Sequence, residues 1–166
     1  MADLICRFIK TKDPIADGIA WWTNSEWDHF EFGTPDETWL GARAEGGVQE
    51  RFATYCTPIR ERRYARTVTD EQLSLIMSRA RAKVGTKYDF MDIAGLLLHN
   101  RWLSLHPTDK EICSMYGTEM LLSIYQARDL LNVLPNFTPL ITPEMLHLSP
   151  LWVESDLCKC IYSLGV

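Results

Sequence analysis

The chain has 166 residues, of which 46% are hydrophobic and 23% are charged, as expected for one globular domain that buries a core. Its formal charge of -5 gives no general electrostatic reason to bind nucleic acid or an anionic membrane surface. We therefore expect a single domain over residues 1–166 with no nucleic-acid partner. The longest apolar run, Ile93 to Leu98, is far shorter than the roughly 20 residues of a membrane span, so no integral membrane association is expected.

The first half of the chain has turn residues between short alternating segments, which predicts strands. The expected elements are a strand at 4–9, a short helix at 13–22, and strands at 27–32, 38–44, 48–52 and 57–64. In the second strand, Trp27, His29 and Glu31 share one face. Phe30 and Phe32 share the other face and indicate contact with a core, which leaves the first face available for polar chemistry.

The second half of the chain reads as helices followed by closing strands. Thr69 and Gln72 form a capping box before an apolar helical repeat, and Gly85 follows as its C-terminal cap. Further helices are expected at 89–99 and 111–131, then a short one opened by Thr142 and Pro143. One or two strands are expected between residues 151 and 163. This order predicts an α+β fold with a small antiparallel sheet packed against helices.

The cysteines number five, at positions 6, 56, 113, 158 and 160. No basic, apolar leader precedes them, so we expect free thiols in a reducing, cytoplasmic compartment. Cys158 and Cys160 lie one residue apart, which is poor geometry for a disulfide. No C-x-x-C or H-x-x-x-H spacing accompanies them, so we predict neither a metal nor a cofactor.

Cys113 is the cysteine placed near the start of a predicted long helix. The positive end of a helix dipole favours a thiolate, so this residue is a candidate nucleophile. The alternative, that Cys113 simply packs in the core, is equally consistent with the sequence.

A thiol nucleophile needs a base, and His29 is the best placed histidine. It lies in mid-strand, with Glu31 on the same face within reach of its ring. His99 and His106 flank a predicted loop and His147 lies in the last predicted helix, and all three are interpreted as surface or loop-anchoring residues.

Several segments in matching order resemble the circularly permuted papain-like cysteine hydrolases of the NlpC type. They are Ser25 to Phe30, Gly47-Val48, Gly85 to Asp89, and Cys113-Ser114, with the histidine before the cysteine. The resemblance spans about Trp21 to Tyr125 and implies a permuted papain-like fold, with a small antiparallel sheet or half-barrel packed against helices.

Carried over to this sequence, the resemblance implies that Cys113 is the nucleophile and His29 the general base. The chain departs from the pattern at two positions. Asp28 replaces the serine that precedes the histidine, and Gly41, ahead of Ala42, occupies the position of the third polar group. We expect Glu31, or a backbone carbonyl, to orient His29 instead.

The predicted function is hydrolysis of an amide or acyl ester through a Cys113 acyl-enzyme. The expected substrates are peptides or isopeptides, cell-wall peptides, and lipid esters, and the resemblance does not choose among them. The alternatives are an inactive binding or phage-assembly module on the same scaffold, and a small structural zinc protein. A phage-encoded or virion-associated origin is a second interpretation of the missing leader. The sequence leaves the oligomeric state open.

Overall fold

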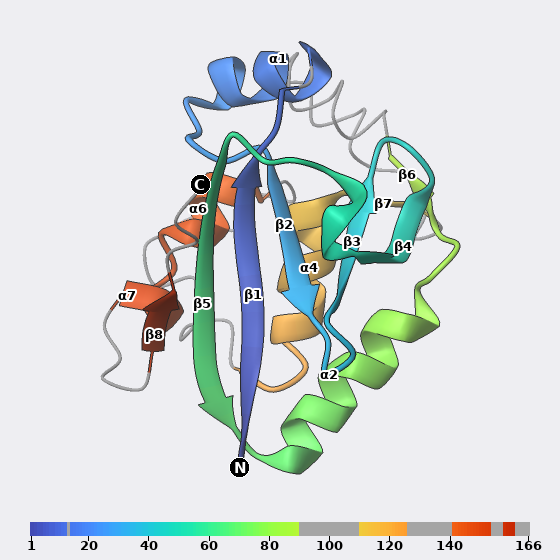
Figure 1. Cartoon of the computed structure of the whole chain (residues 1–166), viewed down its shortest axis with the longest axis vertical. Coiled ribbons are helices and arrows are strands. Elements are labelled where there is room, and N and C mark those ends of the chain that lie inside the picture. Colours follow the sequence, from blue (N-terminus) through green and yellow to red (C-terminus); the bar gives the residue numbers. More distant parts are fainter. Residues whose placement is uncertain (13, 90–109, 126–140, 154–157, 162–166) are drawn as a thin grey trace.

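The central element of the computed structural model is a six-stranded antiparallel sheet with the strand order β4-β3-β2-β1-β5-β8 (Figure 1). The structure describes residues 1–12, 14–89, 110–125, 141–153 and 158–161. The strands are β1 (Ala2–Lys10), β2 (His29–Gly33), β3 (Thr38–Arg43), β4 (Gly47–Phe52), β5 (Arg60–Val68) and β8 (Cys158–Ile161). This confirms the coarse expectation of an α+β chain with an antiparallel sheet.

Strand β1 lies in the middle of the sheet, paired with β2 on one side and with β5 on the other. Its residues Leu4, Cys6 and Phe8 are fully buried, which explains why the strand is so apolar. Arg7 is also buried, at 1% exposure. A charged side chain at such a position needs an ionic partner, and Arg7 finds it on β2.

The helices cover one side of the sheet and its ends (Figure 1). They are α1 (Pro14–Thr23), α2 (Asp70–Ala82), α4 (Cys113–Leu121), α6 (Pro143–His147) and α7 (Pro150–Val153). A 3-10 turn, η1 (Ala53–Tyr55), links β4 to β5, and the short strands β6 (Lys87–Tyr88) and β7 (Lys110–Glu111) form a separate parallel pair. Helix α4 packs against β2 and β3, and α2 packs against β1 and α4.

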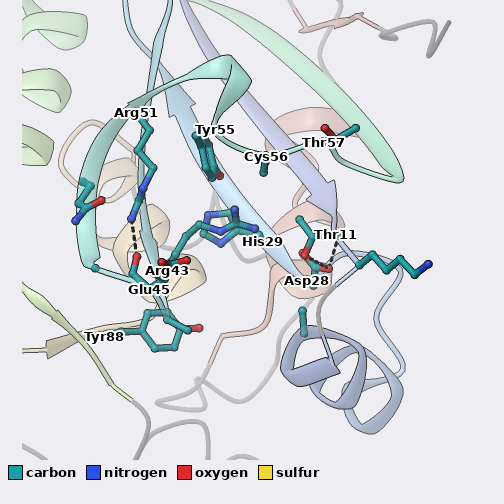
Figure 2. Close-up of a pocket in the computed structure, with 15 residues that line it drawn as sticks. Thr11, Asp28, His29, Arg43, Glu45, Arg51, Tyr55, Cys56, Thr57 and Tyr88 are labelled. Atoms are coloured by element: carbon teal, nitrogen blue, oxygen red, sulfur yellow. Dashed lines mark hydrogen bonds between the residues drawn. The ribbon is translucent and has the colours of Figure 1, made fainter.

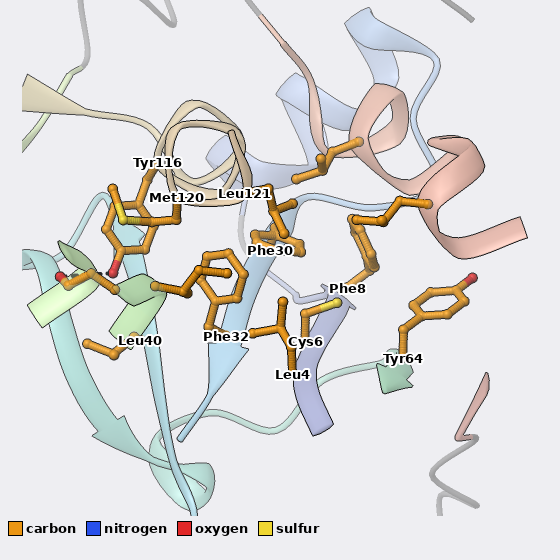
Figure 3. Close-up of a cluster of buried hydrophobic side chains, with 14 of the residues drawn as sticks. Leu4, Cys6, Phe8, Phe30, Phe32, Leu40, Tyr64, Tyr116, Met120 and Leu121 are labelled. Carbon is orange, nitrogen blue, oxygen red and sulfur yellow. Dashed lines mark hydrogen bonds between the residues drawn. The ribbon is translucent and has the colours of Figure 1, made fainter. Parts of the chain in front are cut away.

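The core lies between the sheet and α4 (Figure 3). Phe30 and Phe32 of β2 are fully buried there, with ring centroids 4.9 Å apart. Tyr116 and Met120 approach them from α4, as the helical repeat predicts. Trp27 also belongs to this core, because the alternating face of β2 begins only at His29.

The two predicted N-terminal caps are confirmed. Thr69 accepts a hydrogen bond from the backbone N–H of Gln72, and the Gln72 side chain accepts one from the backbone N–H of Thr69. Thr142 caps α6 with Pro143 at its start. The predicted C-terminal cap of α2 is wrong, because Lys83 is the C-cap and Gly85, with a φ of +94°, donates its N–H to the carbonyl of Val48.

Several predicted boundaries are wrong. The strand expected at 57–64 is Arg60–Val68, and the strand expected at 27–32 begins at His29. The helix expected at 111–131 begins only at Cys113, because Lys110 and Glu111 form β7, and it ends at Leu121 with Leu122 as its C-cap. The expected strand from residue 151 is helical as far as Val153. There Ser149 accepts a hydrogen bond from the backbone N–H of Leu151, so Ser149-Pro150 opens a helix as Thr142-Pro143 does.

Other expectations fall on residues that the structure does not describe. The helix predicted at 89–99 lies there beyond Asp89, and so do His99, His106 and residues 126–131. Among the described helices, none has the length and apolar character needed to cross a bilayer.

Candidate active site

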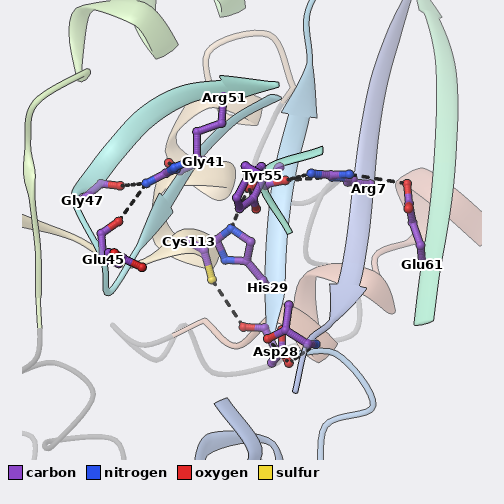
Figure 4. Close-up of polar contacts among 12 residues, drawn as sticks. Arg7, Asp28, His29, Gly41, Glu45, Gly47, Arg51, Tyr55, Glu61 and Cys113 are labelled. Atoms are coloured by element: carbon purple, nitrogen blue, oxygen red, sulfur yellow. Dashed lines mark hydrogen bonds and ion pairs between the residues drawn. The ribbon is translucent and has the colours of Figure 1, made fainter. Parts of the chain in front are cut away.

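The predicted pair of His29 and Glu31 meets on one face of β2 (Figure 4). His29 Nε2 lies 3.0 Å from Glu31 Oε1, which is hydrogen-bond distance. Both side chains are buried, with His29 4% and Glu31 0% exposed. Because the carboxylate accepts the proton on Nε2, the other ring nitrogen, Nδ1, is left as an acceptor.

Cys113 is the first residue of α4, and its thiol lies against the backbone on both sides of His29. The thiol donates to the carbonyl oxygen of Asp28 at 3.9 Å and accepts from the backbone N–H of Phe30. Figure 4 shows the sulfur directed toward Asp28, whereas the hydrogen bond of the His29 ring leaves on the opposite side. The structure therefore brings together the three residues predicted to form the catalytic site.

One packing feature explains why α4 reaches this point. Four residues after Cys113, a Cβ on Gly117 would collide with the Phe30 ring, so glycine allows the helix to approach the strand closely.

Glu31 is held by groups from two other parts of the chain, and a third part leaves space for it. Arg7 Nε donates to Glu31 Oε2 at 2.8 Å, and Arg7 Nη2 lies 2.6 Å from the same oxygen. The Tyr55 hydroxyl donates to Glu31 Oε1 at 2.5 Å. A Cβ on Gly41 would lie 2.7 Å from Glu31 Cγ, so the glycine of β3 leaves the space that the carboxylate occupies.

Burial controls the protonation of this site. It lowers the pKa of His29 to about 4, against the opposing effect of Glu31. It raises the pKa of the Cys113 thiol to about 12, although backbone N–H groups favour the thiolate. Burial opposes ionisation of Glu31 too, but His29 and Arg7 hold its pKa at about 2. At neutral pH the site therefore contains a neutral thiol, a neutral imidazole and a carboxylate.

A pocket of about 650 Å³ opens on His29 (Figure 2). Its lining includes Asp28, Arg43, Tyr55 and Cys56, and Figure 2 shows the His29 ring between Asp28 at one end and Arg51 at the other. Cys113 does not line it and is 3% exposed. The sulfur is therefore not open to this pocket.

The remaining described histidine, His147, lies outside this site. Its Nε2 is 2.9 Å from the Tyr64 hydroxyl, and its ring packs against those of Phe8 and Trp27. His147 lies in the short helix expected there, but the expectation of a surface residue is wrong, because its side chain is 7% exposed. Within the described ranges, no group of three or more His, Cys, Asp or Glu side chains is arranged to hold a metal ion.

Sequence reasoning missed Arg7 and Tyr55 as partners of Glu31. The sequence assigns no role to Arg7, and Tyr55 lies in a 3-10 turn without a motif. The signal for Arg7 was present, because a charge in the middle of a buried strand requires a counter-charge. The counter-charge could be identified as Glu31 only from the register of β1 with β2, because that register places Arg7 opposite Glu31.

Neither a protein-family model nor a curated protein matches the sequence. Among solved structures, the chain is similar to the metalloprotein YiiX from Escherichia coli O157:H7, with a TM-score of 0.55 and 16% identity. The match covers 98% of this chain and 88% of that one. At this level of identity the likeness concerns the fold alone.

Proposed function

We propose that the chain is a thiol hydrolase of the permuted papain-like type, which cleaves an amide or acyl ester through an acyl-enzyme on Cys113. The observation that carries the proposal is the contact of the Cys113 thiol with the backbone on both sides of His29, whose ring is held by Glu31. A nucleophile, a base and a group that orients the base are the three parts that such chemistry needs.

In the proposed reaction, His29 Nδ1 takes the proton of the Cys113 thiol as the sulfur attacks the substrate carbonyl carbon. The tetrahedral intermediate collapses to a thioester, and the imidazolium gives the proton to the leaving nitrogen or oxygen. Water then attacks the thioester and gives its proton to His29. The carbon–sulfur bond breaks, and the proton returns to the sulfur.

Glu31 stabilises the imidazolium that forms in both steps. Its Oε1 accepts the Nε2 proton of His29, while Arg7 and Tyr55 fix the carboxylate so that the ring has one orientation. Burial and the neighbouring Glu31 raise the pKa of Tyr55, so its hydroxyl keeps the proton that it donates. Proton transfer from sulfur to imidazole must accompany attack, because the resting pair is neutral.

The similar structure YiiX is described as a metalloprotein. The described residues of this chain do not fit that chemistry, since they contain no cluster of three metal-ligating side chains. The proposed reaction therefore includes no step through a metal.

A second candidate is a binding module whose site has lost its activity. The supporting observation is that Cys113 is 3% exposed and does not line the pocket. Burial also raises the pKa of its thiol to about 12, which opposes formation of the nucleophile. The two candidates differ in whether an acyl group can reach the sulfur.

Reaction with p-nitrophenyl acetate separates them. The matched parent is the Cys56→Ala variant, which removes the half-exposed thiol of the pocket as a source of background acetylation. For the hydrolase we expect a burst of p-nitrophenolate and an acetyl adduct that peptide mass spectrometry assigns to Cys113. Adding Cys113→Ala abolishes the burst, and adding His29→Gln slows it by about a hundredfold or more.

A folded Cys56→Ala protein that gives no burst and no adduct on Cys113 would establish the inactive module. Equal burst rates with and without His29 would instead show that the imidazole takes no part.

A further inference from the structure

Helix α6 is bonded to the chain on both sides of the proposed catalytic site. Just before α6, the carbonyl oxygen of Ile141 accepts a hydrogen bond from the hydroxyl of Ser114, the residue after the nucleophile. In the first turn of α6, Glu144 Oε2 accepts from the backbone N–H of Glu26 at 2.8 Å. Glu26 lies shortly before β2, whose first residue is His29. One short helix therefore contacts the chain beside the nucleophile and the chain beside the base.

Residues 25–28 lead from α1 into β2 and belong to neither a helix nor a strand. Their position therefore depends on separate hydrogen bonds of their backbone N–H groups. Three of these groups donate within the chain around α1 and β1, namely those of Ser25 to Ala20, of Trp27 to the Ser25 hydroxyl and of Asp28 to Ile9. The fourth, the N–H of Glu26, donates to Glu144. Among these four bonds, it is the one that joins residues 25–28 to α6.

The Glu144 carboxylate sits on a helix that is anchored to the sheet. Its Oε1 lies 3.8 Å from His147 Nδ1 in the same helix. His147 Nε2 in turn lies 2.9 Å from the Tyr64 hydroxyl of β5. The carboxylate of Glu26 pairs with Arg60 at 2.6 Å, which offsets the repulsion between the two glutamates. Glu144 is therefore a fixed acceptor for the Glu26 N–H.

The backbone that follows residues 25–27 contacts the sulfur of Cys113 directly. The carbonyl oxygen of Asp28 accepts from the thiol at 3.9 Å, and the N–H of Phe30 donates to the sulfur. Both groups belong to the backbone, so their positions depend on the path by which the chain enters β2. His29 lies between them, and its ring must approach the sulfur to take the proton. A shift of the incoming chain would move the base relative to the nucleophile, and small displacements of reacting groups cost rate.

We infer that Glu144 is a positioning residue of the catalytic site, which holds the chain before β2 through the Glu26 N–H and so fixes His29 against Cys113. The inference rests on the proposed hydrolase function and adds to it a residue that lies outside the lining of the pocket. Glu144 acts through the backbone of residues 26–30 and contacts neither the sulfur nor the imidazole of the proposed pair.

Two substitutions at residue 144 separate the hydrogen bond from the charge. Glu144→Gln removes the charge but keeps a side-chain oxygen at the same reach, whereas Glu144→Asp keeps the charge and withdraws the oxygen from the Glu26 N–H. In the Cys56→Ala parent we expect Glu144→Asp to slow the p-nitrophenolate burst about tenfold, the usual worth of a hydrogen bond to a charged group. We expect Glu144→Gln to keep the burst rate within about threefold of the parent.

Glu119→Asp is the matched control for shortening a glutamate. Glu119 of α4 pairs with Lys83 at 2.8 Å, and its side chain is 53% exposed. The same loss of one methylene group there is expected to leave the burst rate unchanged, because an exposed ion pair contributes little.

Hydrogen exchange of backbone amides tests the inference without turnover. The amides of Glu26 and Phe30 are those bonded to Glu144 and to the sulfur. In the folded Glu144→Asp protein both should exchange about tenfold or more faster than in the parent, and in Glu144→Gln they should stay close to the parent. NMR measures the exchange of each amide. A role of Glu144 in overall stability alone would instead speed exchange throughout the core by a common factor.

Unchanged exchange of the Phe30 amide in Glu144→Asp overturns the inference. Equal slowing of the burst by Glu144→Gln and Glu144→Asp also overturns it, because the charge would then account for the effect. Failure of the hydrolase proposal has a different signature, namely no burst and no acetyl adduct on Cys113 in the parent itself. In that case the exchange of the two amides still decides whether Glu144 holds the entrance to β2.

Discussion

Glu31 fits beside β3 only because residue 41 is glycine. A Cβ there would lie 2.7 Å from Glu31 Cγ, closer than such atoms approach in proteins. The position at which the resembled family carries its third polar group is therefore the space used by a carboxylate from the neighbouring strand. In the proposed site the carboxylate of Glu31 takes the place of that third polar group, and Gly41 leaves the space that it needs.

Substituting this glycine tests the relationship. Gly41→Ala is expected to lower the free energy of unfolding by about 1–3 kcal/mol through overpacking, and to slow acetylation of Cys113 because the carboxylate must move. Thermal unfolding and the p-nitrophenolate burst measure the two effects. Gly18→Ala is the matched control, since a Cβ at Gly18 of α1 meets nothing within 4 Å. Equal stability of the two variants would contradict the crowding at Glu31.

The buried ion pair of Arg7 and Glu31 is expected to contribute far more to stability than a surface pair. Arg7→Met leaves the Glu31 carboxylate buried without its cation, which costs about 3–5 kcal/mol. Arg60→Met breaks the pair with Glu26, whose side chains are 63% and 43% exposed, and is expected to cost about 1 kcal/mol or less. Chemical denaturation measures both, and similar losses would contradict the assignment.

Stability is expected to fall on acidification because His29 is held neutral. Burial lowers its pKa from 6.5 to about 4, so between these values the unfolded chain binds a proton that the folded protein does not. The free energy of unfolding therefore decreases as the pH falls from 6.5 to about 4. Glu31, with a pKa lowered from 4.5 to about 2, adds a further loss below 4.5.

The His29→Gln variant isolates the first part of this loss. Its unfolding free energy is expected to change less with pH between 6.5 and 4 than that of the parent. NMR of the imidazole C–H signals checks the cause directly. A His29 signal that titrates near the ordinary value of 6.5 would contradict the buried, neutral ring.

Thiol labelling of the free protein is expected to favour Cys56 over Cys113. Cys56 is partly exposed in the pocket, whereas Cys113 is buried and burial raises its pKa to about 12. Labelling of Cys113 by iodoacetamide should be slow and rise about tenfold per pH unit, without a plateau, through the neutral range. Peptide mass spectrometry at several pH values measures both. Faster labelling of Cys113 near pH 6 would show a thiolate–imidazolium pair at rest.

The parts of the site that the sequence predicted are those set by short-range periodicity. His29 and Glu31 lie two residues apart on a strand, so alternation alone places them on one face. The capping box at Thr69 and the start of α6 at Thr142 are equally local. Periodicity does not predict that Cys113 lies near His29. That prediction came from the order of motifs in the resembled family.

Local sequence patterns could not predict which residues contact Glu31. Arg7 meets Glu31 through the register of β1 with β2, and Tyr55 reaches it from the turn after β4. The role of Gly41 depends on its being the cross-strand neighbour of Glu31, and reading the position alone suggested a missing group. Such contacts follow from strand order, which one sequence does not specify.

The central position of β1 has a consequence for synthesis of the protein. Residues 2–10 pair on one side with residues 29–33 and on the other with residues 60–68, so the middle of the sheet can close only after residue 68 has left the ribosome. Cys113 follows a further 45 residues along the chain, since 113 minus 68 is 45. The base and its carboxylate therefore emerge before the nucleophile, and the growing chain can assemble its proton-handling half first.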